Sequence, residues 1–236
     1  MRKFLLAFTA AALLAPLALH AGAYDDFEGQ MRDAYSNYRV ALLMSNQGKA
    51  DKTAEALGAM AEKWTILEDA WKTTPPPQYA DDPGFADTLD RVAKIIASAR
   101  QTVRDGDVAK AHVALEKIRT DLGALHLRNG LMWFSDRLNA YHVQMEETLT
   151  ADYSGQADGG LERMREQAAV LVYLAHDLVA HPSVNSADPD YPGLVKALVG
   201  SAEAFQAAAR GGDVKAALAA RAGLKPAYAK LFIRFG

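Results

Sequence analysis

Apolar residues recur at steps of three and four along almost the whole chain, and this periodicity constrains the fold more than any other feature of the sequence. Residues three or four positions apart lie on one face of an α-helix, so each run predicts an amphipathic helix with one buried face. Eight such stripes follow one another, and no segment alternates convincingly between apolar and polar residues as a strand would. The sequence therefore predicts an all-α protein of about eight helices.

The stripes are separated by short segments rich in glycine, proline, asparagine and aspartate, which are typical of turns. Pro226 lies inside the last stripe, and a proline in a helix interior removes a backbone hydrogen bond and clashes with the preceding turn. We therefore expect the eighth helix to kink or restart near Gly223. In chain order the stripes cover residues 27–42, 57–71, 89–103, 108–125, 134–149, 161–178, 194–205 and 214–235.

The second half of the sequence repeats features of the first half at a spacing of 106 residues. Gly106-Asp107-Val108 matches Gly212-Asp213-Val214 at the start of the fourth and eighth helices. In each motif the glycine suits the end of one helix and the aspartate suits the N-cap of the next. These matches predict a tandem duplication of an antiparallel four-helix bundle, over residues 24–130 and 131–236. Chance similarity between helices rich in alanine and leucine is the alternative.

Residues 1–23 have the layout of a cleaved secretory signal peptide. Arg2 and Lys3 precede an apolar run over residues 4–14, and Ala21-Gly22-Ala23 provides a cleavage site of small residues. The apolar run is short for a membrane span, which needs about 20 residues. We therefore expect export to the periplasm, with no membrane span after cleavage. An uncleaved membrane anchor is the alternative.

The composition excludes several classes of site. The 236 residues include no cysteine, which excludes disulfides, cysteine zinc sites, iron–sulfur clusters and covalently attached haem. The formal net charge is −3, and Lys and Arg are scattered among Asp and Glu, so nucleic acid is not an expected partner. The sequence has no Walker loop, nucleophile elbow, His-Glu-x-x-His or Glu-x-x-His motif. A non-enzymatic role is therefore favoured, with an enzyme of unknown class as an alternative.

The second half contains one group of candidate ligands for a soft metal. His142 and Met145 are three residues apart on the fifth predicted helix, and an antiparallel sixth helix would bring Met164 opposite Met145. Thioether and imidazole ligands suit Cu(I), and Glu146 would add a carboxylate. These residues support the hypothesis of a copper-binding protein. The alternative is that both methionines only fill the core.

The first half contains a candidate site of aromatic and arginine side chains. Tyr35, Tyr38 and Trp64 lie on predicted inner stripes, and Arg39 follows Tyr38 directly. Buried tyrosine and tryptophan usually need a polar partner, so a cavity among these residues would suit a small anionic or planar ligand. The alternative is an aromatic-rich core with the arginines outside it.

The other histidines are interpreted as structural residues. His112 and His126 flank the fourth stripe, so we expect them at the edge of the core. His176 should approach Asp136 if the fifth and sixth helices are antiparallel. His181 lies at the end of the sixth helix, where the helix dipole favours a positive charge.

The order of these features resembles that of the periplasmic cytochrome c′ and c556 group. Members of that group are exported four-helix bundles with a tyrosine–arginine pair early in the first helix, which Tyr38-Arg39 matches. Their last helix carries the haem-binding cysteines and histidine, but the corresponding segments here, residues 122–128 and 226–232, contain no cysteine. The resemblance therefore implies the fold alone. At most it implies a haem-less, duplicated relative that works near periplasmic electron transfer or metal handling.

Together these features predict a periplasmic, non-enzymatic binding or accessory protein. A groove between the two bundles, or the core of one bundle, would hold a small ligand or a protein partner. The alternatives are a protein that binds copper or another transition metal, and an enzyme of unknown class. No cofactor is certain, and copper is the one that the candidate ligands suggest.

Overall fold

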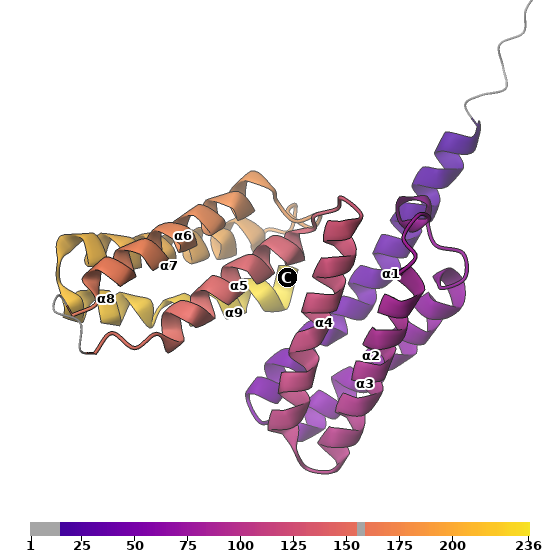
Figure 1. Ribbon diagram of the computed structural model, residues 1–236, viewed down its shortest axis with the longest axis horizontal. Helices are drawn as coiled ribbons and strands as arrows, with labels where there is room; N and C mark the ends of the chain where they lie inside the picture. Colours follow the sequence, from indigo (N-terminus) through magenta and orange to yellow (C-terminus); the bar gives the residue numbers. More distant parts are fainter. Residues whose placement is uncertain (1–14, 155–158) are drawn as a thin grey trace, which may run out of the picture.

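The computed structural model describes residues 15–154 and 159–236, and in these ranges the fold is all-α, with no β-strand (Figure 1). This confirms the fold class predicted from the periodicity. The described helices are α1 (Ala15–Asn46), α2 (Ala50–Trp71), the 3-10 helix η1 (Pro77–Tyr79), α3 (Phe85–Arg104), α4 (Val108–Arg128), α5 (Phe134–Thr150), α6 (Leu161–Ala180), α7 (Tyr191–Gly211), α8 (Val214–Arg221) and α9 (Leu224–Phe235). Helices α8 and α9 together occupy the eighth predicted segment, and the break between them falls at Gly223, as expected.

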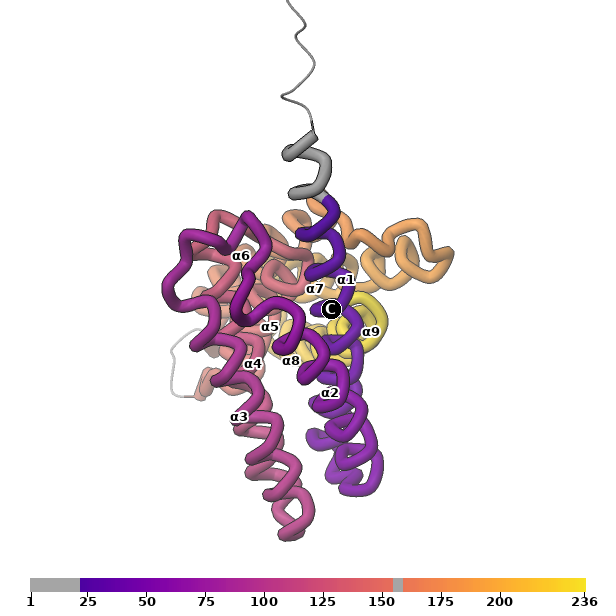
Figure 2. The backbone as a smooth tube through the Cα atoms, turned by 90° about the vertical axis from the view of Figure 1, so that its right-hand side faces the viewer, coloured from indigo at the N-terminus to yellow at the C-terminus, as the bar shows by residue number. Residues whose placement is uncertain are grey.

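The helices pack as two groups, which we call the first and second bundles. The first consists of α1–α4, with α1 against α2 and α3 against α4, and the second consists of α5–α9, in which α7 lies against α6, α8 and α9. The bundles meet where α9 lies against α1 and where α4 leads into α5 (Figures 1 and 2). The helices of each predicted unit thus pack among themselves. The evolutionary duplication stays a prediction.

The matched turns before α4 and α8 are built alike. Gly106 and Gly212 both have the left-handed backbone conformation, with φ of +88° and +82°. Residues other than glycine rarely adopt this conformation. The Asp107 and Asp213 side chains then accept hydrogen bonds from the backbone N–H three residues further on, at 2.9 and 3.0 Å. The predicted roles of glycine and aspartate in these turns are therefore confirmed.

The predicted stripes form the core of both bundles, with a few exceptions. Trp64, Tyr141 and Phe205 are among the largest fully buried side chains. Leu218, which the sequence placed on the last stripe, is 37% exposed, and Ala217 is buried instead. The prediction failed there because α8 is only eight residues long and the helix restarts at Leu224. The stripe of α9 does not continue the face of α8.

Helix α1 extends beyond the first bundle at its N-terminal end (Figure 1). Within α1, Phe27 is fully buried, and the ring of Tyr24 lies 6.3 Å from that of Tyr79. The predicted signal peptide, residues 1–23, lies largely outside the described residues, and residues 15–23 are the first turns of α1. No helix in the described part of the chain has the length and hydropathy of a membrane span.

Candidate functional site

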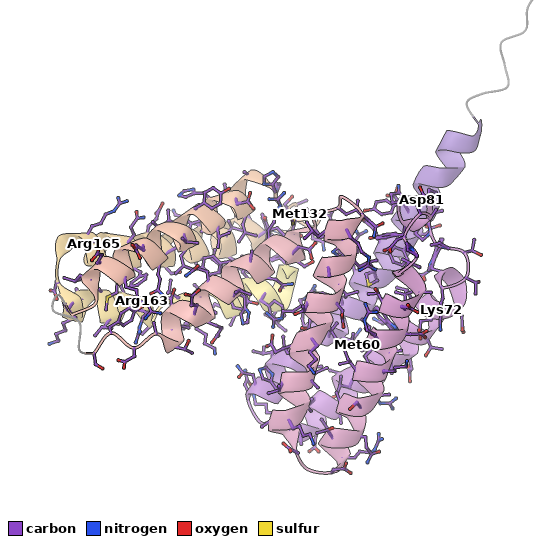
Figure 3. The ribbon with its side chains drawn as sticks, in the orientation of Figure 1. Met60, Lys72, Asp81, Met132, Arg163 and Arg165 are labelled. Carbon is purple, nitrogen blue, oxygen red and sulfur yellow. The ribbon has the colours of Figure 1, made fainter. Side chains whose placement is uncertain are left out.

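A cavity of about 810 Å³ lies between the two bundles, and we call it the groove. Its lining residues lie within residues 24–39 of α1, 131–137 at the start of α5, 180–185 after α6 and 235–236 at the end of α9. Met132, one of them, is seen where the bundles meet (Figure 3). The volume is in the range of small-molecule sites, roughly 300–1,000 Å³.

Trp133 forms part of the groove wall and is held by residues of α4 and α5. Its ring stacks on the imidazole of His126, with the centroids 4.1 Å apart. The Asp136 carboxylate lies 2.8 Å from His126 Nδ1 and accepts a hydrogen bond from the Trp133 backbone N–H at 2.8 Å. Asp136 thus caps the start of α5 and fixes His126 behind Trp133. The side chain of Trp133 is therefore held in place where it lines the groove.

The indole N–H of Trp133 is buried and has no hydrogen-bond partner. The Tyr24 side chain lies close to the indole. Burial and Glu28 raise the pKa of Tyr24 to about 12, and the nearby indole opposes this shift. A buried polar group without a partner costs free energy, so this unpaired donor lowers the stability of the groove wall.

Two predictions about histidine are wrong in this region. His126 is 2% exposed, and it lies in the core rather than at its edge. Asp136 pairs with His126, whereas His176 lies 3.2 Å from Glu203. The reason is that Asp136 is the third residue of α5, and its carboxylate turns back toward the start of its own helix and α4. The sequence feature that indicates this capping role of Asp136 is its position as an acidic residue in the first turn of the helix that follows Asn129-Gly130.

The charged side chains of the groove are mostly paired. Arg32 lies 2.6 Å from Glu28, which also lines the groove, and Arg137 lies 2.6 Å from Asp177, which does not. Asp33, a further lining residue, forms an ion pair with a lysine of α2. Three arginines line the groove together with the side-chain carboxylates of Glu28 and Asp33 and the carboxylate of Gly236, so the lining carries balanced charges of both signs.

Arg39, a predicted ligand residue, lines the groove and attaches α1 to the end of α9. Its Nε donates to the carbonyl of Ile233 at 3.3 Å, and its Nη atoms donate to those of Arg234 and Gly236. The last carbonyls of a helix have no partner within the helix, and a cation is favoured at that end. The guanidinium therefore caps α9 from the other bundle.

The other predicted ligand residues of the first bundle are divided between the groove and the core. Tyr35 lines the groove, and burial raises its pKa. Tyr38 and Trp64 are buried and do not line the groove. The Tyr38 hydroxyl accepts a hydrogen bond from Arg119 Nε at 3.3 Å, and Trp64 Nε1 donates to the Leu89 carbonyl at 3.2 Å. The structure thus brings only Tyr35 and Arg39 of the four to one cavity.

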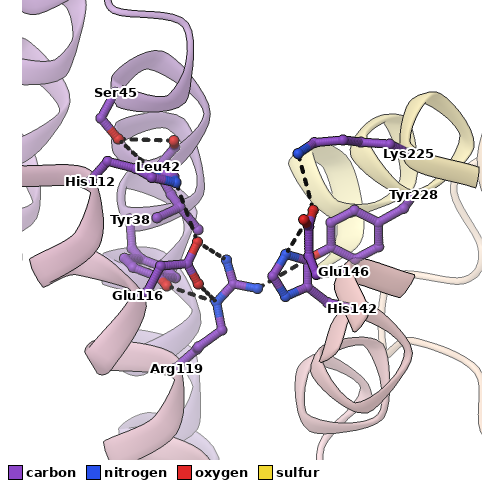
Figure 4. A network of polar contacts seen from close by, with 10 residues as sticks. All are labelled: Tyr38, Leu42, Ser45, His112, Glu116, Arg119, His142, Glu146, Lys225 and Tyr228. Carbon is purple, nitrogen blue, oxygen red and sulfur yellow. Dashed lines mark hydrogen bonds and ion pairs between the residues drawn. The ribbon is translucent and has the colours of Figure 1, made fainter. Parts of the chain in front are cut away.

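A second cavity, of about 350 Å³, also lies between the bundles, and we call it the polar cavity. Figure 4 shows that α4 contributes side chains from one side and that α5 and α9 contribute side chains from the other. Its charged and aromatic polar lining consists of His112, Glu116, Arg119, His142, Glu146, Lys225 and Tyr228.

Arg119 joins the two bundles across the polar cavity, and no pattern in the sequence pointed to it. The residue is 7% exposed, and its guanidinium donates to the hydroxyls of Tyr38 and Tyr228 at 3.3 Å each. It also forms an ion pair of 2.9 Å with Glu116, and it lies 5.4 Å from the ring centre of Phe232. Burial opposes the charge, but the two tyrosines and Glu116 favour it and raise the pKa of Arg119.

His142 is held neutral on the opposite side of the polar cavity. Burial lowers its pKa to about 3, and the nearby charges of Arg119, Lys225 and His112 lower it as well. Its Nε2 lies 3.8 Å from a carboxylate oxygen of Glu146, which lies 3.0 Å from Lys225 Nζ. The lysine thus pairs more closely with Glu146 than the imidazole does.

The predicted copper ligands do not line one cavity. His142 and Glu146 line the polar cavity, whereas Met145 and Met164 are fully buried and do not line it. Among the residues that the structure describes, no group of three or more His, Asp or Glu side chains could hold a metal ion. The copper hypothesis therefore stays a prediction, and it depends on two thioethers that belong to the core.

Comparison with known proteins identifies no relative. No family model, no curated protein and no solved structure matches the chain. The geometry of the two cavities is therefore the basis for any functional proposal.

Asp136→Ala should lower the free energy of unfolding by about 2–3 kcal/mol, because the variant loses an N-cap contact and leaves a buried imidazole without its partner. Urea unfolding would measure the loss. Asp87→Ala is the matched control, since Asp87 is an exposed acidic residue in the first turn of α3. Equal effects of the two substitutions would contradict the role assigned to Asp136.

Proposed function

We propose that the protein is an exported, non-enzymatic binding protein and that its ligand binds in the groove. The groove itself carries the proposal, because it is a cavity of about 810 Å³ between the bundles and Trp133, Phe134 and Phe235 are among the side chains that line it. The groove also has the size and the mixture of aromatic and charged residues that are typical of small-molecule sites. A small ligand is therefore favoured over a protein partner.

The proposed export is supported by the start of α1. Helix N-termini are stabilised by acidic residues in the first turn. The helix as it stands has no acidic residue in its first turn, but a helix that began at Tyr24 would have Asp25 and Asp26 there. Cleavage after Ala23 would also leave Phe27, which is fully buried, within one turn of the new end. These features fit a mature periplasmic protein that begins at Tyr24.

The experiment is native mass spectrometry of the protein purified from the periplasmic fraction of cells that express the full chain. We expect the mass of a chain that begins at Tyr24, with a non-covalent small-molecule adduct. Ser36→Trp should abolish the adduct, because Ser36 lines the groove and the indole would fill it. Ser98→Trp is the control, because Ser98 is exposed on α3.

Two results would contradict the proposed binding site. One is the absence of an adduct from the wild-type protein, and the other is an adduct that Ser36→Trp retains. A chain that still begins before Tyr24 would contradict the proposed cleavage without bearing on the groove.

A further inference from the structure

We infer that the groove binds an uncharged, apolar small molecule. This inference rests on the proposed function and specifies its ligand. Two features of the groove carry it. The charged groups of its lining already have protein partners, and two large apolar side chains of its lining are exposed to solvent.

The charged groups of the lining are satisfied within the protein. Contacts of 2.6–3.0 Å join the side chains to partners of opposite charge, and Arg39 donates to Gly236 and to two further carbonyls of α9. The charged and imidazole groups of the lining are those of Glu28, Arg32, Asp33, Arg39, Arg137, His181 and the carboxylate of Gly236.

This pairing disfavours a charged ligand of either sign. Three arginines are balanced by three carboxylates, so neither sign is in excess in the lining. A charged ligand would have to displace one of the existing partners or enter the groove without a counter-charge, and both events cost free energy. An uncharged ligand does neither.

Met132 and Val184 are large apolar side chains of the lining that are 51% and 71% exposed. Met132 precedes α5, where the bundles meet (Figure 3), and Val184 lies between α6 and α7. Apolar side chains exposed singly are ordinary on a protein surface, but these two line one cavity together with Trp133, Phe134 and Phe235. An apolar molecule in the groove would remove both side chains from water, which is favourable.

The segment that carries Val184 is held in place beside an aromatic wall. The Ser183 backbone N–H donates a hydrogen bond to the Tyr191 hydroxyl at 3.1 Å, and Tyr191 is 6% exposed. The rings of Phe134 and Phe235 lie 5.9 and 5.1 Å from that of Tyr191. Val184 is therefore exposed on an ordered segment, and an apolar ligand binds there without the cost of ordering the chain.

The test uses two fluorescent probes with the same ring system, of which only one is charged. N-phenyl-1-naphthylamine is uncharged, and 8-anilinonaphthalene-1-sulfonate carries a negative charge. We expect the uncharged probe to bind about tenfold more tightly, because the sulfonate loses hydration without gaining a free counter-charge. Equal binding of the two probes, or tighter binding of the sulfonate, would overturn the inference.

Two substitutions test the apolar contacts themselves. Val184→Asn and Met132→Gln replace an apolar side chain by a polar one of similar size, and each should weaken the uncharged probe about three- to tenfold, since part of the apolar burial is lost. Val113→Asn is the matched control, because Val113 is 64% exposed on α4 and does not line the groove. It should change the Kd less than about twofold.

The substituted side chains are exposed, so we expect the three variants to fold, and circular dichroism checks this. Equal effects of Val184→Asn and Val113→Asn would show that the probe binds exposed apolar side chains in general, and would overturn the inference.

The groove-filling variant separates this inference from the proposed function. Ser36→Trp should abolish binding of the uncharged probe, and a probe that still binds would lie outside the groove and contradict the inference. If the native adduct is lost in Ser36→Trp but the sulfonate binds as tightly as the uncharged probe, the ligand class is wrong and the binding site stands. If neither an adduct nor probe binding is found, both fail.

Discussion

Arg119→Met is expected to lower the free energy of unfolding by about 3–5 kcal/mol, the cost of breaking a buried charged network by removing one partner. Methionine fills the space of the side-chain stem but makes none of its hydrogen bonds. The hydroxyls of Tyr38 and Tyr228 lose their donor, and Glu116 loses an ion pair of 2.9 Å at a partly buried position. Because Tyr38 belongs to the first bundle and Tyr228 to the second, the loss acts on the contact between the bundles.

Urea unfolding of the variant, followed by circular dichroism, measures this loss. Arg100→Met is the matched control, since Arg100 is exposed on α3, and it should cost less than about 0.5 kcal/mol. A double-mutant cycle with Tyr228→Phe should give a coupling energy of about 1–2 kcal/mol between Arg119 and Tyr228. Equal losses for the two methionine variants would show that Arg119 does not hold the bundles together.

The sequence predicted the helices well because periodicity and turn chemistry are local. An apolar stripe is recognised from residues of a single helix. The Gly106-Asp107 turn is determined by its backbone conformation and by one side-chain hydrogen bond. Leu218 was misplaced because one short helix ends and another begins between it and Tyr228. The error lay in joining two helices into one face.

The candidate site could be predicted only in part, because its residues meet through packing between the bundles. Tyr35 and Arg39 were selected together because they share one helix, and they do line one cavity. Trp64 was selected by the same reasoning, but a stripe does not indicate whether its side chains meet a cavity or the core. Arg119 and Trp133 were not selected, since their partners lie on other helices or beyond a turn.

Tyr38 and Arg39 form the pair on which the resemblance to cytochrome c′ and c556 proteins is based. In this chain both side chains make structural contacts. Tyr38 accepts a hydrogen bond from Arg119, and Arg39 caps the end of α9. The Arg39 contact joins the two bundles, whereas the Tyr38 contact lies within the first bundle and positions Arg119, which reaches Tyr228 of the second. The resemblance itself stays a prediction, but these contacts explain why the pair is useful in a protein without haem.

His142 should make the protein lose stability as the pH falls below about 6.5. Its folded-state pKa is about 3, against 6.5 in the unfolded chain. Between these values the unfolded chain binds more protons, so the stabilisation is complete above 6.5 and is lost as the pH approaches 3. From pH 7 to pH 4.5 the loss amounts to about 2.5 kcal/mol. Arg119, Lys225 and His112 oppose protonation, and Glu146 is the acidic group that faces the imidazole.

The measurement compares urea unfolding of the wild type and His142→Leu at pH 7 and pH 4.5. Other groups titrate in this range in both proteins, so the difference between the two pH dependences isolates His142. We expect the variant to lose about 2.5 kcal/mol less than the wild type on acidification. His176→Leu is the control, because the His176 side chain is 55% exposed, and it should keep the wild-type dependence. If His142→Leu and His176→Leu respond alike, His142 is not the buried neutral group between the bundles. The packing of α5 against α4 and α9 around the polar cavity would then be looser than the structure shows.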